Sequence, residues 1–261
     1  MSTSDIFFEH DQKIGTITFN RPHALNAITW AMYDSLLEYC EAINGSSEIR
    51  VVVLRGTGSK AFVAGTDITQ FQAFTEPDDG IAYEQRIDLV LDKLEHLNKP
   101  TIAEIDGIAV GGGCAIAAAC DLRICSNRSR FGVPIARTLG NCLSASNYAR
   151  FLDLIGPTLL KEMLYTGRLF DADDAKAAGF ITSVVEPDML DASVKQIAET
   201  IAANAPLTIR ASKEMIRRVQ EHRRIDPAIG HDLIKTCYTS NDFKEGVLAF
   251  LQKRPPRWSG S

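Results

Sequence analysis

Two short glycine-containing segments carry the residues whose types and spacing could do chemistry. Residues 107–113 read GIAVGGG and residues 64–67 read AGTD, and each segment follows a strand-like run. Glycine permits positive φ and lets the backbone approach a ligand without a Cβ in the way. Two such turns at the ends of strands in one sheet can aim two backbone N–H groups at one oxygen and so form an oxyanion hole.

The glycine run has other interpretations. Close packing of a helix on a strand also requires small residues, and it needs no ligand. A helix that starts at the glycines would present free N–H groups and a positive dipole end to an anion. The run is neither G-x-G-x-x-G nor a P-loop with its Lys and Ser/Thr, so it does not indicate a nucleotide phosphate.

Strand and helix patterns alternate around these segments and predict an α/β core. A hairpin is expected from runs 6–10 and 14–20, a helix capped by Thr29 to about residue 44, and a buried parallel strand at 51–54. A helical stripe covers 80–97, a strand follows at 101–106, a helix starts near Gly112, and another strand lies around 122–125. Strands separated by helices favour βαβ crossovers.

The chain changes character near residue 190. Four helical patterns follow with short breaks, at 192–203, 207–220, 227–238 and 242–252. We therefore divide the sequence into an α/β core at 1–190 and a helical C-terminal subdomain at 191–261, the latter suited to oligomerisation.

Composition excludes several classes of function. The 261 residues carry a net charge of −5, so no bulk positive field attracts nucleic acid or an anionic membrane. The basic run at 217–224 is interpreted as a solvated helix face rather than an RNA site. No signal peptide or membrane helix is evident, and we expect a cytoplasmic protein. The six cysteines form no C-x-x-C pair and lie mostly in apolar sequence, which predicts reduced core thiols and no metal site.

Several ordered motifs resemble the crotonase, or enoyl-CoA hydratase/isomerase, superfamily. The likeness runs from about residue 6 to residue 255 in matching order and spacing. The matching segments are Asn20–Pro22 with Ala24–Ala27, Ala61–Ile68, Gly107–Gly113, Cys120–Arg123, Phe131–Pro134, Leu164–Gly167, Ala175–Gly179 and Glu245–Arg254.

The resemblance implies a fold, a site and an assembly. The fold is a crotonase-like ββα spiral core with an α-helical C-terminal trimerisation subdomain. In that family the residues matching Thr66 and Gly112 donate the two oxyanion N–H groups to a thioester carbonyl. The implied coenzyme A contacts, at the cofactor-binding edge, are Ala24, Leu25, Ala64, Gly65, Asp67, Ile68, Gly111 and Lys253.

The partner implied by the resemblance is an acyl-CoA substrate, with no cofactor beyond the CoA moiety itself. Family members assemble as trimers or paired trimers through their C-terminal helices. We therefore expect a homotrimer or a dimer of trimers, and expect neither nucleic acid nor a membrane as a partner.

The sequence departs from the hydratase pattern at two positions. Hydration needs one group to take a proton from water and another to give a proton α to the thioester, and the related hydratases use two glutamates. The matching positions here are Ala115 and Ile135, and neither side chain titrates. If the alignment at the second of these positions is shifted by one or two residues, Ala136 or Arg137 takes the place of the glutamate, and neither supplies a carboxylate.

Three interpretations remain open. The chain could be a hydratase or isomerase with substituted chemistry, using Asp67, Arg137, Asn141 or Cys142. It could carry out decarboxylation or thioester hydrolysis, which need little beyond oxyanion stabilisation. It could also bind acyl-CoA without turnover.

Each candidate side chain also has a purely structural explanation. Asp67 could cap the helix that follows it, and Arg137 could be a surface residue in an ion pair. Asn141 follows Gly140 and could be a turn residue, and Cys142 could simply pack, because no histidine lies near it in the sequence.

Overall fold

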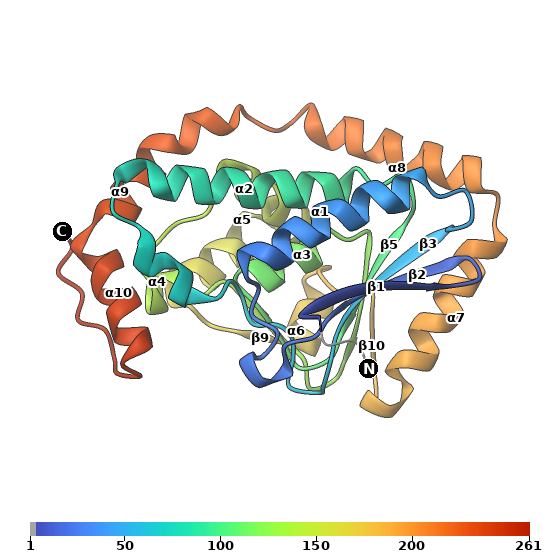
Figure 1. Ribbon diagram of the computed structural model, residues 1–261, viewed down its shortest axis with the longest axis horizontal. Coiled ribbons are helices and arrows are strands. Elements are labelled where there is room, and N and C mark those ends of the chain that lie inside the picture. Colours follow the sequence, from blue (N-terminus) through green and yellow to red (C-terminus); the bar gives the residue numbers. More distant parts are fainter. Residues whose placement is uncertain (1–3) are drawn as a thin grey trace.

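The computed structural model describes residues 4–261, apart from the side chains of Pro77 and Pro227, and a six-stranded sheet forms its centre (Figure 1). The strand order is β1-β2-β3-β5-β7-β10. β1 and β2 form an antiparallel hairpin, and the other pairings are parallel. The strands are β1 Ile6–Asp11, β2 Ile14–Phe19, β3 Val51–Gly56, β5 Thr101–Ile105, β7 Leu122–Ser126 and β10 Ser183–Val185.

A second, four-stranded sheet has the order β4-β6-β8-β9. Its strands are β4 Ala61–Val63, β6 Ile108–Val110, β8 Arg130–Gly132 and β9 Phe170–Asp171. β4, β6 and β8 each follow a strand of the first sheet after a short turn, so the chain repeatedly adds one strand to each sheet and then a helix. This repeat confirms the ββα spiral implied by the family resemblance.

Helices cover both faces of the first sheet. They are α1 Trp30–Gly45, α2 Pro77–Glu95 and α3 Gly112–Ala119 on one face, and α7 Leu190–Ala203 on the other. Successive residues of β3 pack on opposite faces of the sheet. Val52 and Leu54 pack in the cluster with α1, α2 and α3, whereas Val51 and Val53 pack with α7. Burial on both faces explains the continuous apolar run of this strand.

Local signals account for several helix boundaries. The Thr29 hydroxyl accepts from the Met32 amide and caps α1, as its sequence predicts. α2 begins three residues earlier than the helical stripe suggested, at Pro77. Between β4 and α2 lies a 3₁₀ segment, η2 Ile68–Ala73.

The remaining elements of the core connect these layers. α5 contains a break at Gly156, which has φ +70° and precedes Pro157. The connecting elements are η1 Pro22–Ala24, α4 Ile135–Thr138, α5 Ala145–Thr166, α6 Ala172–Ala177 and η3 Pro187–Met189.

The C-terminal region is helical, in agreement with the sequence pattern. Its elements are α8 Pro206–Glu221, η4 Pro227–Gly230, α9 His231–Thr239 and α10 Asn241–Leu251. α9 packs on α2, and α10 packs on η2 and α9 (Figure 1). α7 covers the sheet, so by its contacts it belongs with the core. The division at residue 190 stays a prediction.

All six cysteines are free thiols, and five of them are buried. This agrees with the expectation of reduced core residues. Within residues 4–261, no helix combines the length and the apolar character needed to cross a membrane.

Candidate active site

The two glycine turns meet at the carboxyl ends of adjacent parallel strands. β4 leads to Gly65 and Thr66, and β6 leads to Gly111 and Gly112, the first residue of α3. A Cβ placed on Gly112 would lie 3.7 Å from the Thr66 nitrogen, and one on Gly65 would lie 4.0 Å from the Gly112 nitrogen. The amides of Thr66 and Gly112 are therefore near neighbours.

Glycine is required where these turns form. Gly65 has φ +91° and Gly111 has φ +54°, in the region that side chains rarely adopt. A Cβ on Gly113 would lie 2.0 Å from the Val63 carbonyl oxygen, so only glycine lets α3 start this close to β4.

Neither amide is used inside the protein. Within residues 4–261, the Thr66 and Gly112 N–H groups donate to no protein acceptor, whereas the Gly65 carbonyl accepts from Ile28 and the Gly111 amide donates to Gly132. Two neighbouring free donors, one at the positive end of a helix, can stabilise a developing negative charge on oxygen.

Three hydroxyls lie directly beside this amide pair. The Thr66 Oγ1 is 2.9 Å from the Tyr33 hydroxyl and 2.9 Å from the Tyr83 hydroxyl. We call Tyr33, Thr66 and Tyr83 the hydroxyl chain. Burial raises the pKa of both tyrosines above the ordinary value, so both stay protonated near neutral pH.

Asp67 is held by other groups. Its carboxylate accepts from the Thr69 amide and hydroxyl at the start of η2, and it pairs with Arg21 at 3.1 Å. Burial opposes ionisation, but the Thr69 hydrogen bonds and the Arg21 charge outweigh it and lower the pKa of Asp67. Asp67 therefore caps η2, which is the structural role given above as the alternative to a catalytic one.

The predicted coenzyme edge forms one surface around a left-handed bend. Leu25, after η1, has φ +52°, and its carbonyl accepts from the Ala64 amide at 3.0 Å. The buried Asn26 donates to the Ala61 carbonyl at 2.8 Å and so fastens the bend to β4. Ala24 and Leu25 therefore lie beside Ala64, as the assignment of a shared edge requires.

Two other predicted coenzyme contacts lie at different places. Ile68 begins η2, directly after Asp67. Lys253 is exposed beyond the end of α10, and no described contact joins it to the bend or to the glycine turns.

The positions expected for carboxylates are apolar and buried. Ala115 lies in the first turn of α3 and Ile135 starts α4, and both belong to the main core cluster. Ile135 also borders a cavity of about 380 Å³ together with Asn141, Tyr148 and Tyr165.

Arg137 and Cys142 lie outside the two glycine turns. Arg137 is exposed on α4 and lies against Gly167, and no described ion pair involves it. Cys142 is buried in an apolar cluster with Phe71 and Ile234.

Asn141 belongs to a second buried polar group. Its amide donates to the Tyr238 hydroxyl at 3.0 Å, and that hydroxyl donates to Glu84 Oε1 at 2.7 Å. The Ser144 amide donates to Glu84 Oε2 at 2.9 Å. We call Glu84, Tyr238, Asn141 and Ser144 the carboxylate group. Burial, with a smaller contribution from Asp88, raises the pKa of Glu84 to about 8.

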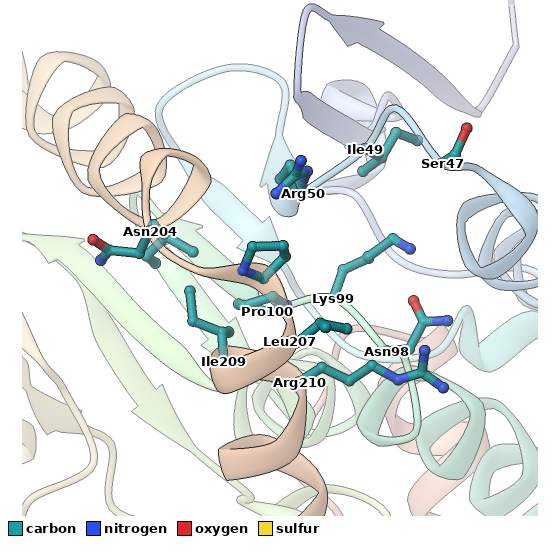
Figure 2. A pocket seen from close by; sticks show the side chains of 12 residues that line it. Ser47, Ile49, Arg50, Asn98, Lys99, Pro100, Asn204, Leu207, Ile209 and Arg210 are labelled. Carbon is teal, nitrogen blue, oxygen red and sulfur yellow. The ribbon is translucent and has the colours of Figure 1, made fainter.

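A separate cavity of about 250 Å³ lies at the opposite ends of the strands of the first sheet (Figure 2). Arg50 precedes β3, Lys99 precedes β5, and Arg210 lies on α8, and all three line it. Its residues are distinct from those of the glycine turns, so it takes no part in the candidate active site.

Sequence analysis missed the hydroxyl chain and the buried Glu84. A signal for Tyr33 was present, because it shares the apolar stripe of α1 with Leu36 and Cys40, and a buried tyrosine hydroxyl requires a partner. The identity of that partner, Thr66, depends on packing between distant segments.

Comparison with known proteins agrees with this geometry. The enoyl-CoA hydratase/isomerase family model matches residues 9–261. The chain is 34% identical over 256 residues to a short-chain-enoyl-CoA hydratase of Clostridium acetobutylicum, with 97% of each chain covered.

Solved structures give the same result. An enoyl-CoA hydratase/carnithine racemase from Magnetospirillum magneticum is 34% identical, with a TM-score of 0.81 and 100% and 97% of the two chains covered. A methylmalonyl-CoA decarboxylase in complex with 2-nitronate-propionyl-CoA is 28% identical, with a TM-score of 0.90 and full coverage of both chains. The glycine turns, the two-sheet spiral and these likenesses lead to one conclusion: the chain belongs to the enoyl-CoA hydratase/isomerase family.

Proposed function

We propose that this chain is an acyl-CoA-processing enzyme of the enoyl-CoA hydratase/isomerase type. The Thr66 and Gly112 amides would form the oxyanion hole that holds the thioester carbonyl and stabilises its enolate. The observation that carries the proposal is the pair of neighbouring N–H groups with no acceptor in the protein. The CoA moiety of the substrate would be the only cofactor.

The predicted coenzyme contacts support the direction of binding. Ala24 and Leu25 lie beside Ala64, on the side of β4 from which Gly65 and Thr66 continue. A coenzyme at this edge would place its thioester at the carboxyl ends of the strands, where open α/β folds bind ligands.

Decarboxylation of a malonyl-type thioester is the second candidate. Ala115 and Ile135 supply no titratable group, and the groups next to Thr66 are hydroxyls. Loss of CO₂ leaves an enolate that requires one proton and no general base, whereas hydration requires both an acid and a base. The likeness to a methylmalonyl-CoA decarboxylase supports the same reaction.

Assembly and location complete the proposal. α8 exposes Leu207, Met215, Ile216 and Val219, a set of apolar side chains that suits burial between subunits. We expect a homotrimer or a dimer of trimers in the cytoplasm, and the mass in solution would test the assembly.

The direct test of the hole replaces Gly112 by proline. Proline is tolerated at the first position of a helix and removes the N–H group, while Gly112→Ala keeps that group and adds a similar first carbon. Turnover of crotonyl-CoA and methylmalonyl-CoA should fall about 10²- to 10³-fold in the proline variant relative to the alanine variant. A Cβ at position 112 would lie 2.9 Å from the Tyr33 hydroxyl, so the comparison requires that Gly112→Ala keeps measurable turnover. Equal and measurable rates for the two variants would show that the Gly112 amide is not an oxyanion donor.

A further inference from the structure

The hydroxyl chain has one more proton than its hydrogen bonds use. Three hydroxyls carry three protons, and the two contacts, Tyr33 to Thr66 and Thr66 to Tyr83, engage two of them. Within residues 4–261, no other protein atom is a partner of these three hydroxyls. Whatever their orientation, one proton is left without a protein acceptor.

Two of the three hydroxyls, those of Tyr33 and Thr66, lie next to the amide pair. Thr66 contributes both an unused backbone N–H and the central hydroxyl of the chain. A Cβ on Gly112 would be 2.9 Å from the Tyr33 hydroxyl and 3.4 Å from Thr66 Oγ1. The hydroxyl chain and the two amides therefore border the same small region of the protein.

At the Tyr33 end of the chain burial would make an unpaired donor costly, whereas Tyr83 is half-buried. Tyr33 is fully buried and Thr66 is 9% exposed. A buried polar group without a partner costs about 1–3 kcal/mol in protein mutational data. A bound ligand that accepts the proton would remove this cost.

We propose that the hydroxyl chain of Tyr33, Thr66 and Tyr83 delivers the proton to the α-carbon of the enolate held by Thr66 and Gly112. This inference rests on the proposed function and names the acid that Ala115 and Ile135 do not provide.

The step balances for a malonyl-type thioester. The bond from the α-carbon to the carboxylate breaks, CO₂ leaves, and the electron pair forms the enolate whose oxygen occupies the hole. An O–H bond of the chain then breaks, a C–H bond forms at the α-carbon, and the chain carries the negative charge. Tyr83, the partly exposed end, regains a proton from water.

Addition of water to an enoyl thioester would end with the same protonation of an enolate at the α-carbon, but the attacking water must also lose a proton, and Ala115 and Ile135 supply no acceptor for it. Burial raises the pKa of both tyrosines, so both hydroxyls stay protonated and hold the protons that the chain can give.

The test compares Thr66→Val with Thr66→Ser in ²H₂O. Valine keeps the shape and the backbone N–H but breaks the chain, whereas serine keeps the hydroxyl. The probes are methylmalonyl-CoA and crotonyl-CoA, and the readouts are kcat, KM and the configuration of deuterium at the α-carbon of the product. Thr66→Val should lower kcat about 10²-fold with little change in KM and lose stereospecific deuteration, and Thr66→Ser should retain it.

Two controls separate the outcomes. Tyr39→Phe removes a hydroxyl from the same helix as Tyr33, one that donates to the Ile6 carbonyl in the described part of the chain, and it should leave the product configuration unchanged. If Thr66→Val does not fold, Thr66→Ala makes the same comparison, because it also removes the central hydroxyl and keeps the backbone N–H. Stereospecific deuteration by a chain-breaking variant of an active enzyme overturns the proton delivery alone. A wild-type protein that leaves both thioesters unchanged overturns the proposed function, and the proton delivery with it.

Discussion

Two consecutive residues of α2, Tyr83 and Glu84, enter two different buried polar groups. Tyr83 is one end of the hydroxyl chain beside the glycine turns. Glu84 is the centre of the carboxylate group, which joins α2 to α9 and to the segment after α4. The hydroxyl chain lies beside the two unused amides, whereas each Glu84 oxygen accepts a hydrogen bond from another element of the protein. One group is thus suited to chemistry and the other to holding elements together.

The largest expected effect comes from removing the acceptor of the carboxylate group. Glu84→Leu leaves the Tyr238 hydroxyl and the Ser144 amide buried without an acceptor. We expect a loss of about 1–3 kcal/mol in the free energy of unfolding for each donor, measured by urea denaturation. A loss below about 1 kcal/mol in total would show that Glu84 does not hold these elements together.

The pH dependence of stability should also separate the two groups. The pKa of Glu84 is raised to about 8 in the folded protein, above the value near 4.3 expected after unfolding. The folded state therefore binds more protons between these values, and Glu84 makes stability fall as pH rises from about 4.5 to about 8, by up to about 1.4 kcal/mol per pH unit.

Glu84→Gln removes this contribution while keeping an oxygen acceptor. We expect its unfolding free energy to depend less on pH than that of the wild type in this window, as followed by urea denaturation at a series of pH values. Tyr83→Phe is the matched control, since its hydroxyl does not titrate there, and it should keep the wild-type slope. Equal slopes for the wild type and Glu84→Gln would mean that Glu84 is ionised throughout.

The smallest expected effect on stability is that of Tyr83→Phe. The ring packing against Phe71 and Trp30 is retained, and Thr66 keeps its hydrogen bond to Tyr33. We expect a loss of about 0.5–1.5 kcal/mol in the free energy of unfolding. A loss as large as that of Glu84→Leu would indicate that the hydroxyl chain is mainly a structural element.

The fold was largely predictable because its signals are local. The Thr29 cap, the apolar run of β3 and the glycines after β4 and β6 each act within a few residues. α2 starts three residues before its apolar stripe because a local polar signal sets this boundary: the Asp79 carboxylate accepts from the Glu76 amide.

Only the part of the candidate site that consists of backbone groups could be predicted from the sequence. Thr66 and Gly112 meet because two strands pair, and the glycine types mark both turns. Tyr33 and Tyr83 come from two helices far from Thr66 in the sequence, and no local pattern links a tyrosine on a helix to a threonine in a turn. Asn141 was singled out for its position after a glycine, but its partner Tyr238 lies 97 residues away.

The apolar character of Ala115 and Ile135 affects the charge that an acyl group could carry in this site. Two like unit charges 4 Å apart repel by about 4 kcal/mol at an effective dielectric constant of 20. Carboxylates at these positions would oppose both the enolate and any second negative group on the acyl chain. With hydrocarbon in both places, an anionic acyl group bound at the proposed site would meet no repulsion from residues 115 and 135, so the site would tolerate a negatively charged acyl group.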